Sequence, residues 1–231
     1  MGIRIMDFIE KSNKVLLFIA AIIVIIAVGK SIISDFFRKD YSEPKVQVID
    51  QSDADKEEQK PKLEKRYVGK IKDVHILEIT SDKIIEEQSY SSNAEMMIVS
   101  SSLNLSSNAV NLMFTKAGEK NHLLFENNAL IVEFSPIQLK ETEYRNILSK
   151  NIYSVAKKDT NKDGFLNQND KKELLVSEYD GSHLKSVMDN IEGYQIISND
   201  MVLVYTKESS DTIYYTFNVL TSELTKLDTN L

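Results

Sequence analysis

The chain contains no cysteine and no tryptophan, and only three histidines and seven glycines among its 231 residues. The absence of cysteine excludes disulfides, thiolate metal sites and a cysteine nucleophile. The glycines form no phosphate-binding loop or dinucleotide fingerprint, and no Gly-x-Ser-x-Gly sequence occurs. None of His75, His122 and His183 has a partner at metal-ligand spacing. Because no catalytic motif is recognisable, we expect that the protein is not an enzyme.

The charge balance is acidic, with a formal net charge of −7 at pH 7 and an isoelectric point near 5.1. The lysines and arginines do not gather into a basic patch, so we do not expect nucleic acid as a partner. A chain of 231 residues allows one or two domains, and it is long enough to bury a substantial core without disulfides.

Long apolar runs are rare, and the clearest one lies near the N-terminus. Residues 15–28 are uncharged, and counting through Ile33 gives 19 residues. At about 1.5 Å per residue, such a helix nearly spans a bilayer core of roughly 30 Å. We therefore predict a short tail over residues 1–14 and a transmembrane signal-anchor over residues 15–33, with the lipid bilayer as its partner.

Two other interpretations of this run remain open. Ala27-Val28-Gly29 has the small residues of a signal-peptide cleavage site, and a buried helix of a soluble domain is a further alternative. Apolar residues continue beyond Gly29, which favours an uncleaved anchor; they are Ile32, Ile33, Phe36 and Phe37. Basic residues flank the run on both sides, so the positive-inside rule does not decide its orientation.

Residues 34–66 are rich in charge of both signs and poor in apolar side chains, which is typical of a flexible linker. A short strand over Val46–Ile49 is the alternative within this segment. Residues 67–231 contain short apolar runs, rich in β-branched and aromatic residues and separated by turn signals, which predicts a β-rich soluble domain. The expected strands are Val74–Thr80, Met96–Ser100, Asn111–Thr115, His122–Phe125, Ala129–Phe134, Asn151–Ala156, Glu173–Glu178, Tyr194–Ser198, Met201–Lys207, Thr212–Leu220 and Leu224–Leu227.

One segment also fits a helical period. Its apolar residues recur at helical spacing, so a helix is an open alternative there. These residues are Tyr144, Ile147, Leu148, Ile152 and Val155.

Three segments have similar sequences: residues 111–125, 173–187 and 213–227. Each consists of an apolar strand, a tight turn and a shorter strand. In this they resemble the outer hairpin of a propeller blade of the TolB type, and the 41 residues between Gly181 and Ser222 approach the blade period of about 40–45. The resemblance implies a mainly β fold with a β-meander or propeller-like blades. Because about three blades are fewer than a closed propeller needs, a β-sandwich is the alternative.

The strongest chemical signal is the stretch from Asp159 to Asp170, which matches the calcium-loop pattern D-x-[DN]-x-[DN]-G with an acid at position 12. Ca²⁺ takes six to eight oxygen ligands, so such a loop must converge carboxylates, amides and carbonyls on one point. Gly164 at position 6 permits the required sharp turn. The predicted ligands are Asp159, Asn161, Asp163, the backbone carbonyl of Phe165, Asn167 and Asp170.

Position 12 is Asp170, where an EF-hand usually has a longer glutamate. In this respect the loop resembles the calcium repeat of dockerins, and we expect it to be an insertion between two strands. With only three charged ligands, a dissociation constant on the order of 10⁻⁴ to 10⁻³ M is expected. The alternative is a surface turn rich in Asn, Asp and Gly that binds no metal.

A site of this affinity would be empty in a cytosol with little free Ca²⁺ but would fill in a periplasmic or extracellular space. We therefore expect a single-pass membrane protein with residues 1–14 in the cytoplasm and the β-domain in an extracytoplasmic, periplasmic location. The expected function is that of a binding or structural module of the cell envelope, with an unidentified protein or envelope component as partner. An envelope enzyme or sensor domain without a recognisable motif is the alternative.

Overall fold

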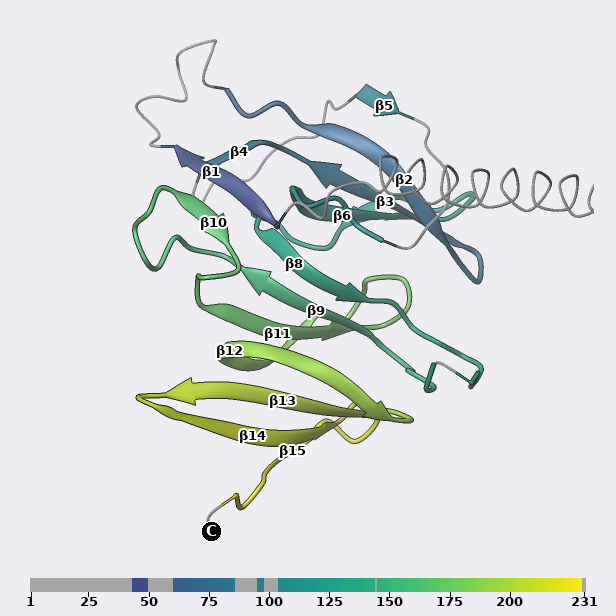
Figure 1. Cartoon of the computed structure of the whole chain (residues 1–231). Coiled ribbons are helices and arrows are strands. Elements are labelled where there is room, and N and C mark those ends of the chain that lie inside the picture. The colour runs from purple at the N-terminus through teal and green to yellow at the C-terminus, as the bar shows by residue number, and fades with distance from the viewer. Residues whose placement is uncertain (1–42, 50–59, 86–94, 98–103, 144, 230–231) are drawn as a thin grey trace, which may run out of the picture. The chain divides into compact units, whose positions relative to one another are not determined.

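Every regular element that the structure describes is a β-strand, which confirms the prediction of a mainly β fold (Figure 1). The structure is a computed structural model that describes residues 43–49, 60–85, 95–97, 104–143 and 145–229. These residues belong to a single unit that runs from Glu43 to Leu231. The predicted tail at 1–14 and the predicted anchor at 15–33 lie outside the described residues. Within the described ranges, no helix is long and apolar enough to cross a bilayer.

The strands follow one another along the chain and are separated mostly by short turns. Their bounds are β1 (Lys45–Ile49), β2 (Glu64–Ile71), β3 (Val74–Thr80), β4 (Lys83–Ile85), β5 (Glu95–Met97), β6 (Ala109–Thr115), β7 (His122–Leu123), β8 (Leu130–Ser135), β9 (Asn151–Ala156), β10 (Phe165–Asn167), β11 (Lys172–Ser177), β12 (Lys185–Ser198), β13 (Met201–Glu208), β14 (Asp211–Asn218) and β15 (Glu223–Lys226).

The described strands form three sheets. The largest has the order β15-β14-β13-β12-β11-β9-β8, so it is an antiparallel meander in which only β10 is skipped. A second sheet has the order β5-β2-β3-β6-β7, and a third has the order β10-β1-β4. The skipped strand β10 therefore leaves the meander between β9 and β11 and pairs with β1, near the start of the described residues.

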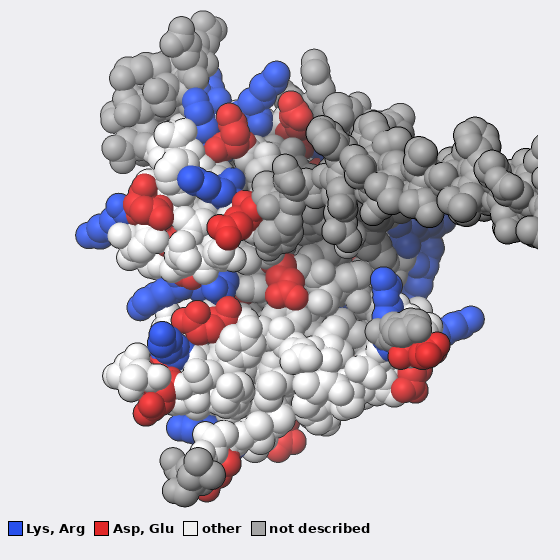
Figure 2. Space-filling model, in the orientation of Figure 1, with Lys and Arg blue, Asp and Glu red and all other residues white. Residues whose placement is uncertain are grey.

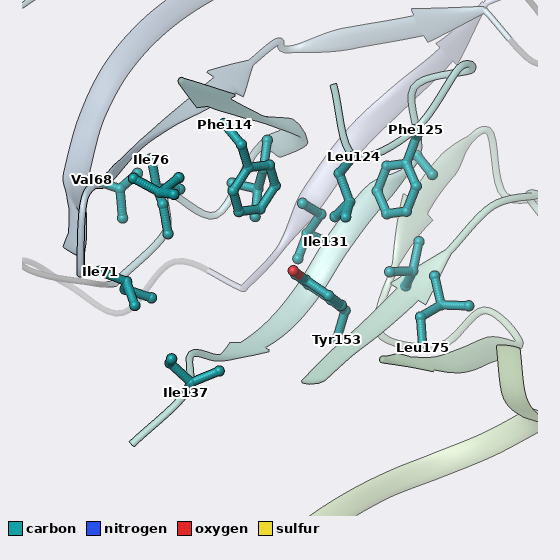
Figure 3. Close-up of a cluster of buried hydrophobic side chains, with 14 residues drawn as sticks. Val68, Ile71, Ile76, Phe114, Leu124, Phe125, Ile131, Ile137, Tyr153 and Leu175 are labelled. Atoms are coloured by element: carbon teal, nitrogen blue, oxygen red, sulfur yellow. The ribbon is translucent and has the colours of Figure 1, made fainter. Parts of the chain in front are cut away.

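The largest core cluster contains side chains from both the five-stranded and the seven-stranded sheet (Figure 3). Phe114 on β6 and Tyr153 on β9 are both almost fully buried in it, and Phe134 stacks on Tyr153 with a ring-centroid distance of 5.2 Å. Neighbouring residues on a strand point to opposite faces. Ile152 accordingly packs in a second cluster, together with Val204 of β13. The inner strands of the meander are therefore buried on both faces.

The helix that was an alternative for the segment around Ile147 and Leu148 does not form. Gln138 and Leu148 instead make an antiparallel bridge, and residues 151–156 form β9 with all six residues buried. A strand covered on both faces needs an unbroken apolar run, and such a run also contains apolar residues at helical spacing.

The predicted linker at 34–66 needs correction at two places, because β1 lies within it and β2 begins at Glu64. Val46 of β1 is fully buried, and Ile49 is 7% exposed. Long-range pairing with β4 and β10 stabilises this short strand despite the charged residues around it. The open alternative of a strand at Val46–Ile49 is therefore correct.

The three similar segments do not form separate blades. Residues 111–125 contain β6 and β7 of the five-stranded sheet, whereas residues 173–187 and 213–227 both lie in the seven-stranded sheet. Each contains an antiparallel hairpin pairing, and such hairpins occur in any meander. A propeller is therefore not supported by the described sheets, and the coarser description, a mainly β meander, holds.

Candidate functional site

The predicted calcium loop connects β9 to β11, and β10 lies inside it. The segment lies between two strands that pair with each other, and it contains a third strand that the sequence does not predict. Leu166, in the middle of β10, is fully buried in a core cluster that also contains Val46 of β1. In the ladder, Leu166 is the direct partner of Val46. The loop is therefore fixed to the fold at both ends and again in its middle.

The sharp turn expected at position 6 is present. Gly164 has a φ angle of +84°, which lies in the left-handed region that residues with a Cβ rarely adopt. A Cβ added there would meet no atom within 4 Å, so the backbone conformation, and not a lack of space, requires glycine. The carbonyl oxygen of Gly164 accepts a hydrogen bond from the amide of Val48 on β1 at 2.9 Å.

The carboxylate of Asp159, at position 1, organises the first half of the loop. Its Oδ1 accepts hydrogen bonds from the amides of Lys162 at 2.6 Å and Asp163 at 3.2 Å. Its Oδ2 accepts one from the amide of Gly164 at 2.8 Å. This is a local side-chain-to-backbone arrangement of the kind that aspartate favours in turns. The chain consequently winds around the Asp159 carboxylate.

Three further predicted ligands meet around the side chain of Asp163. Its Oδ2 accepts hydrogen bonds from the side-chain amides of Asn161 and Asn167, both at 3.1 Å. Its Oδ1 accepts one from the amide of Phe165 at 2.9 Å. Asn161 in turn accepts a hydrogen bond from the amide of Asp163 at 3.0 Å. The fold thus brings positions 3, 5 and 9 of the loop together, as the pattern predicts.

Several effects act on the ionisation of Asp163. Partial desolvation raises the pKa of this carboxyl, but the hydrogen bonds from Asn167, Phe165 and Asn161 and the positive charge of Lys45 together outweigh it. The net pKa lies below the usual value, so the group is ionised at neutral pH. The Nζ of Lys45 sits 3.7 Å from the centre of the Phe165 ring, and this contact holds the cation beside the loop.

Asp170, at position 12, differs from the other acidic residues of the loop in its burial and in its hydrogen-bond partners. It is only 3% exposed, and its Oδ1 accepts hydrogen bonds from the amide of Thr160 at 2.7 Å, the hydroxyl of Thr160 at 3.0 Å and the amide of Asn161 at 3.4 Å. Its Oδ2 accepts one from the amide of Asn167 at 2.9 Å. A carboxylate offers about four acceptor positions, so these bonds occupy them. Asp170 therefore ties the start of the loop to its end.

The predicted ligands consequently divide into two groups. The side chains of Asn161, Asp163 and Asn167 bond one another and Asp159 joins them through the amide of Asp163, whereas Asp170 bonds Asn161 and Asn167 through their backbone amides. Over the ranges that the structure covers, no three acidic or histidine side chains gather into a group that could hold a metal ion. Neutral oxygens, including the carbonyl of Phe165, would have to complete a calcium site built on the first group.

Thr160 and Lys45 take part in the site, although the sequence pattern does not mark them. The Thr160 hydroxyl donates to Asp170 and accepts a hydrogen bond from the amide of Lys171 at 2.9 Å. Position 2 of a calcium loop is not constrained by ligation, so the motif carries no signal for this residue. Lys45 reaches the site only through strand pairing, which spacing within the loop cannot predict.

Two clefts of the described unit contain residues that the sequence singles out, namely Asp170 and His122. One of about 470 Å³ adjoins the end of the loop at Asp170 and Lys171, and the facing strands supply both acidic and basic side chains. The other contains His122 and Asp180 but has a volume of only about 50 Å³, which is far below a typical substrate pocket. On the face drawn in Figure 2, positive and negative side chains are interspersed and do not form a broad patch of one sign.

No protein-family model matches the chain, and neither a characterised protein nor a solved structure is significantly similar to it.

Proposed function

We propose that this protein is a membrane-anchored, extracytoplasmic β-domain that binds Ca²⁺ through loop 159–170 and acts as a binding or structural module of the cell envelope. The hydrogen-bonded network of Asp159, Asn161, Asp163 and Asn167 around the turn at Gly164 carries the proposal. That network gathers the side chains at positions 1, 3, 5 and 9, whose carboxylate and amide groups carry the kind of oxygen that a hard cation binds.

In this proposal Asp159 and Asp163 supply the charged ligands of the ion. Asn161, Asn167 and the carbonyl of Phe165 supply neutral oxygens. Asp170 keeps the loop closed through its bonds to backbone amides, so it acts as a positioning residue. The bound ion would supply a cross-link between the first and second halves of the loop.

Two carboxylates directed at the ion, and Lys45 nearby, favour weak binding, at the upper end of the range of about 10⁻⁴ to 10⁻³ M for extracellular calcium modules. A site of that strength functions where free Ca²⁺ is high. This argument supports an extracytoplasmic β-domain, with the predominantly apolar segment at 15–33 as its anchor.

The cleft that pairs a histidine with an acidic residue, at His122 and Asp180, has a volume of only about 50 Å³, far below a typical substrate pocket, which favours a binding module over an enzyme. The surface of the far end of the meander also suits this role. Tyr205 and Tyr214 form a tilted pair there, with ring centroids 6.4 Å apart, and both are partly exposed. Partly exposed tyrosines are common in protein-binding surfaces.

Calcium titration of the full chain in detergent tests the proposal. At a free Ca²⁺ concentration tenfold above the dissociation constant, linkage stabilises the folded state by about 1.4 kcal/mol. For a domain of this size, this corresponds to a rise of about 3–6 °C in melting temperature. Asp159→Ala and Asp163→Ala should each abolish this rise and the heat of binding measured by isothermal titration calorimetry.

Asp180→Ala is the matched control. Asp180 also caps a turn, accepting hydrogen bonds from the amide of Ser182 at 3.0 Å and its hydroxyl at 2.6 Å, but it lies outside the loop. Its calcium response should equal that of the wild type. A flat titration of the wild-type protein at millimolar Ca²⁺ would show that the loop is a turn without a metal. A reporter fused after Leu231 that is active only in the cytoplasm would refute the topology.

A further inference from the structure

Strand β10 belongs to two structures at once, the candidate calcium loop and the small sheet that holds β1. Its residues Phe165, Leu166 and Asn167 occupy positions 7 to 9 of the loop and pair with residues 47, 46 and 45 of β1. The amide of Val48 also donates to the carbonyl oxygen of Gly164 at 2.9 Å. Four consecutive loop residues therefore contact β1 through backbone hydrogen bonding.

Strand β1 depends on a small number of neighbours. Among the described strands, β4, which runs parallel to it, is its partner on the other side. Further backbone bonds to described residues run from the amide of Lys45 to the Ser107 carbonyl oxygen at 3.0 Å and from the amide of Gln47 to the Asp82 carbonyl oxygen at 2.9 Å. Displacing β10 would leave β1 with an unpaired edge, and its buried Val46 would lose the contact with Leu166.

Ordering of the loop should therefore stabilise the pairing of β10 with β1. An ion held by Asp159, Asn161 and Asp163 restricts the backbone up to Gly164, and a ligand from Phe165 or Asn167 restricts β10 itself. A restricted β10 is a better pairing partner, because less conformational entropy is lost when β1 docks. Coupling of this kind is reciprocal, so a docked β1 must also strengthen ion binding by the same factor.

We propose that the loop is a calcium-dependent clasp for β1, the described strand that follows the predicted membrane anchor in the sequence. This inference rests on the proposed function, because it requires Ca²⁺ to bind at loop 159–170. Calcium stabilises the pairing of β10 with β1 and so strengthens the attachment of the β-domain to the segment that leads to the membrane. Low calcium weakens that attachment.

Hydrogen–deuterium exchange of the full chain in detergent micelles tests the coupling directly. The amides of Gln47 and Val48 should exchange more slowly in Ca²⁺ than in chelator, by up to about tenfold when Ca²⁺ is tenfold above its dissociation constant. The amides of β14 should not respond, because that strand lies further along the meander and contributes no residue to the cleft at the end of the loop. Equal exchange of β1 in the two conditions would overturn the proposal.

A matched pair of variants tests whether the docking of β1 in turn strengthens calcium binding. Val46 on β1 and Val202 on β13 are both fully buried, so Val46→Ala and Val202→Ala create comparable cavities. Val46→Ala should weaken calcium binding at least about threefold, whereas Val202→Ala should leave the dissociation constant unchanged. Equal dissociation constants for both variants, whether unchanged or raised together, would overturn the coupling.

The two proposals fail in different ways. If wild-type protein gives no heat of calcium binding, the proposed function fails and the clasp fails with it. If calcium binds but the exchange of β1 does not change, only the clasp fails. If Val46→Ala does not fold, the exchange measurement on wild-type protein still decides the question.

Discussion

Replacing Asp170 with alanine should destabilise the protein even when no calcium is present. The substitution removes the acceptor for the amides of Thr160, Asn161 and Asn167 and for the Thr160 hydroxyl. Asn167 is only 8% exposed, and a buried donor left without a partner costs about 1–3 kcal/mol. Thr160 and Asn161 are exposed, so water replaces their bonds at a smaller cost. We therefore expect a loss of about 2–4 kcal/mol, because bonds to a charged acceptor are among the stronger ones.

Equilibrium urea unfolding in chelator measures this loss, with Asp159→Ala as the comparison. The carboxylate of Asp159 accepts from Lys162 and Asp163, which are exposed, and from Gly164, which is half-buried. Its replacement should cost only about 1 kcal/mol in chelator. The free energy of unfolding of Asp170→Ala in chelator could instead lie within about 0.5 kcal/mol of the wild-type value, while Ca²⁺ no longer raises its melting temperature. In that case Asp170 is a metal ligand, and its assignment as a positioning residue is wrong.

Two further predictions concern the fold and are checked by the same urea unfolding. Gly164→Ala should cost about 1–2 kcal/mol from its positive φ angle alone, whereas Gly181→Ala should cost more, because a Cβ there would also collide with the ring of Phe114. Arg66→Ala should cost about 3–5 kcal/mol, because it leaves the fully buried carboxylate of Glu78 without its cation. Costs below 1 kcal/mol for Arg66→Ala, or equal costs for the two glycines, would contradict these assignments.

The strands that the sequence predicts best are those whose residues are buried for their whole length. The predicted ranges Val74–Thr80 and Asn151–Ala156 coincide with β3 and β9. In both strands most residues are buried, so apolar and β-branched side chains mark the element from end to end. The predicted strands of the outer meander also form, although β12 begins nine residues earlier than its expected start at Tyr194, with an irregular register over its first half.

Two of the strands that the sequence does not predict are short and depend on distant partners. Strands β4 and β10 have three residues each, which is too few for a period to be recognised. Strand β2 begins among charged residues, and its bulge near Tyr67 interrupts the alternation of side chains. Strands β4 and β10 are stabilised by pairing with β1, far away in the sequence, and β2 is stabilised by its hairpin with β3, so local composition does not mark these strands.

Within the twelve residues of the loop, the sequence likewise predicts the local contacts but not the long-range one. Spacing predicts that Asp159, Asn161, Asp163 and Gly164 form one turn, because every contact in that turn lies within a few residues. The role of Asp170 is different, because the ends of β9 and β11 determine how close it comes to Thr160. A metal-loop pattern specifies which side chains offer oxygens, but not which of those oxygens the folded chain has already engaged.

Attachment of the loop to β1 follows from the burial of Leu166. Position 8 supplies no ligand to a calcium loop, and an exposed leucine there would be a liability. Leu166 is instead fully buried beside Val46, so β10 contributes to the core as well as to the loop. Any ion that orders the loop therefore acts on a core contact of the first described strand, and the free energy of ion binding is shared with the docking of that strand.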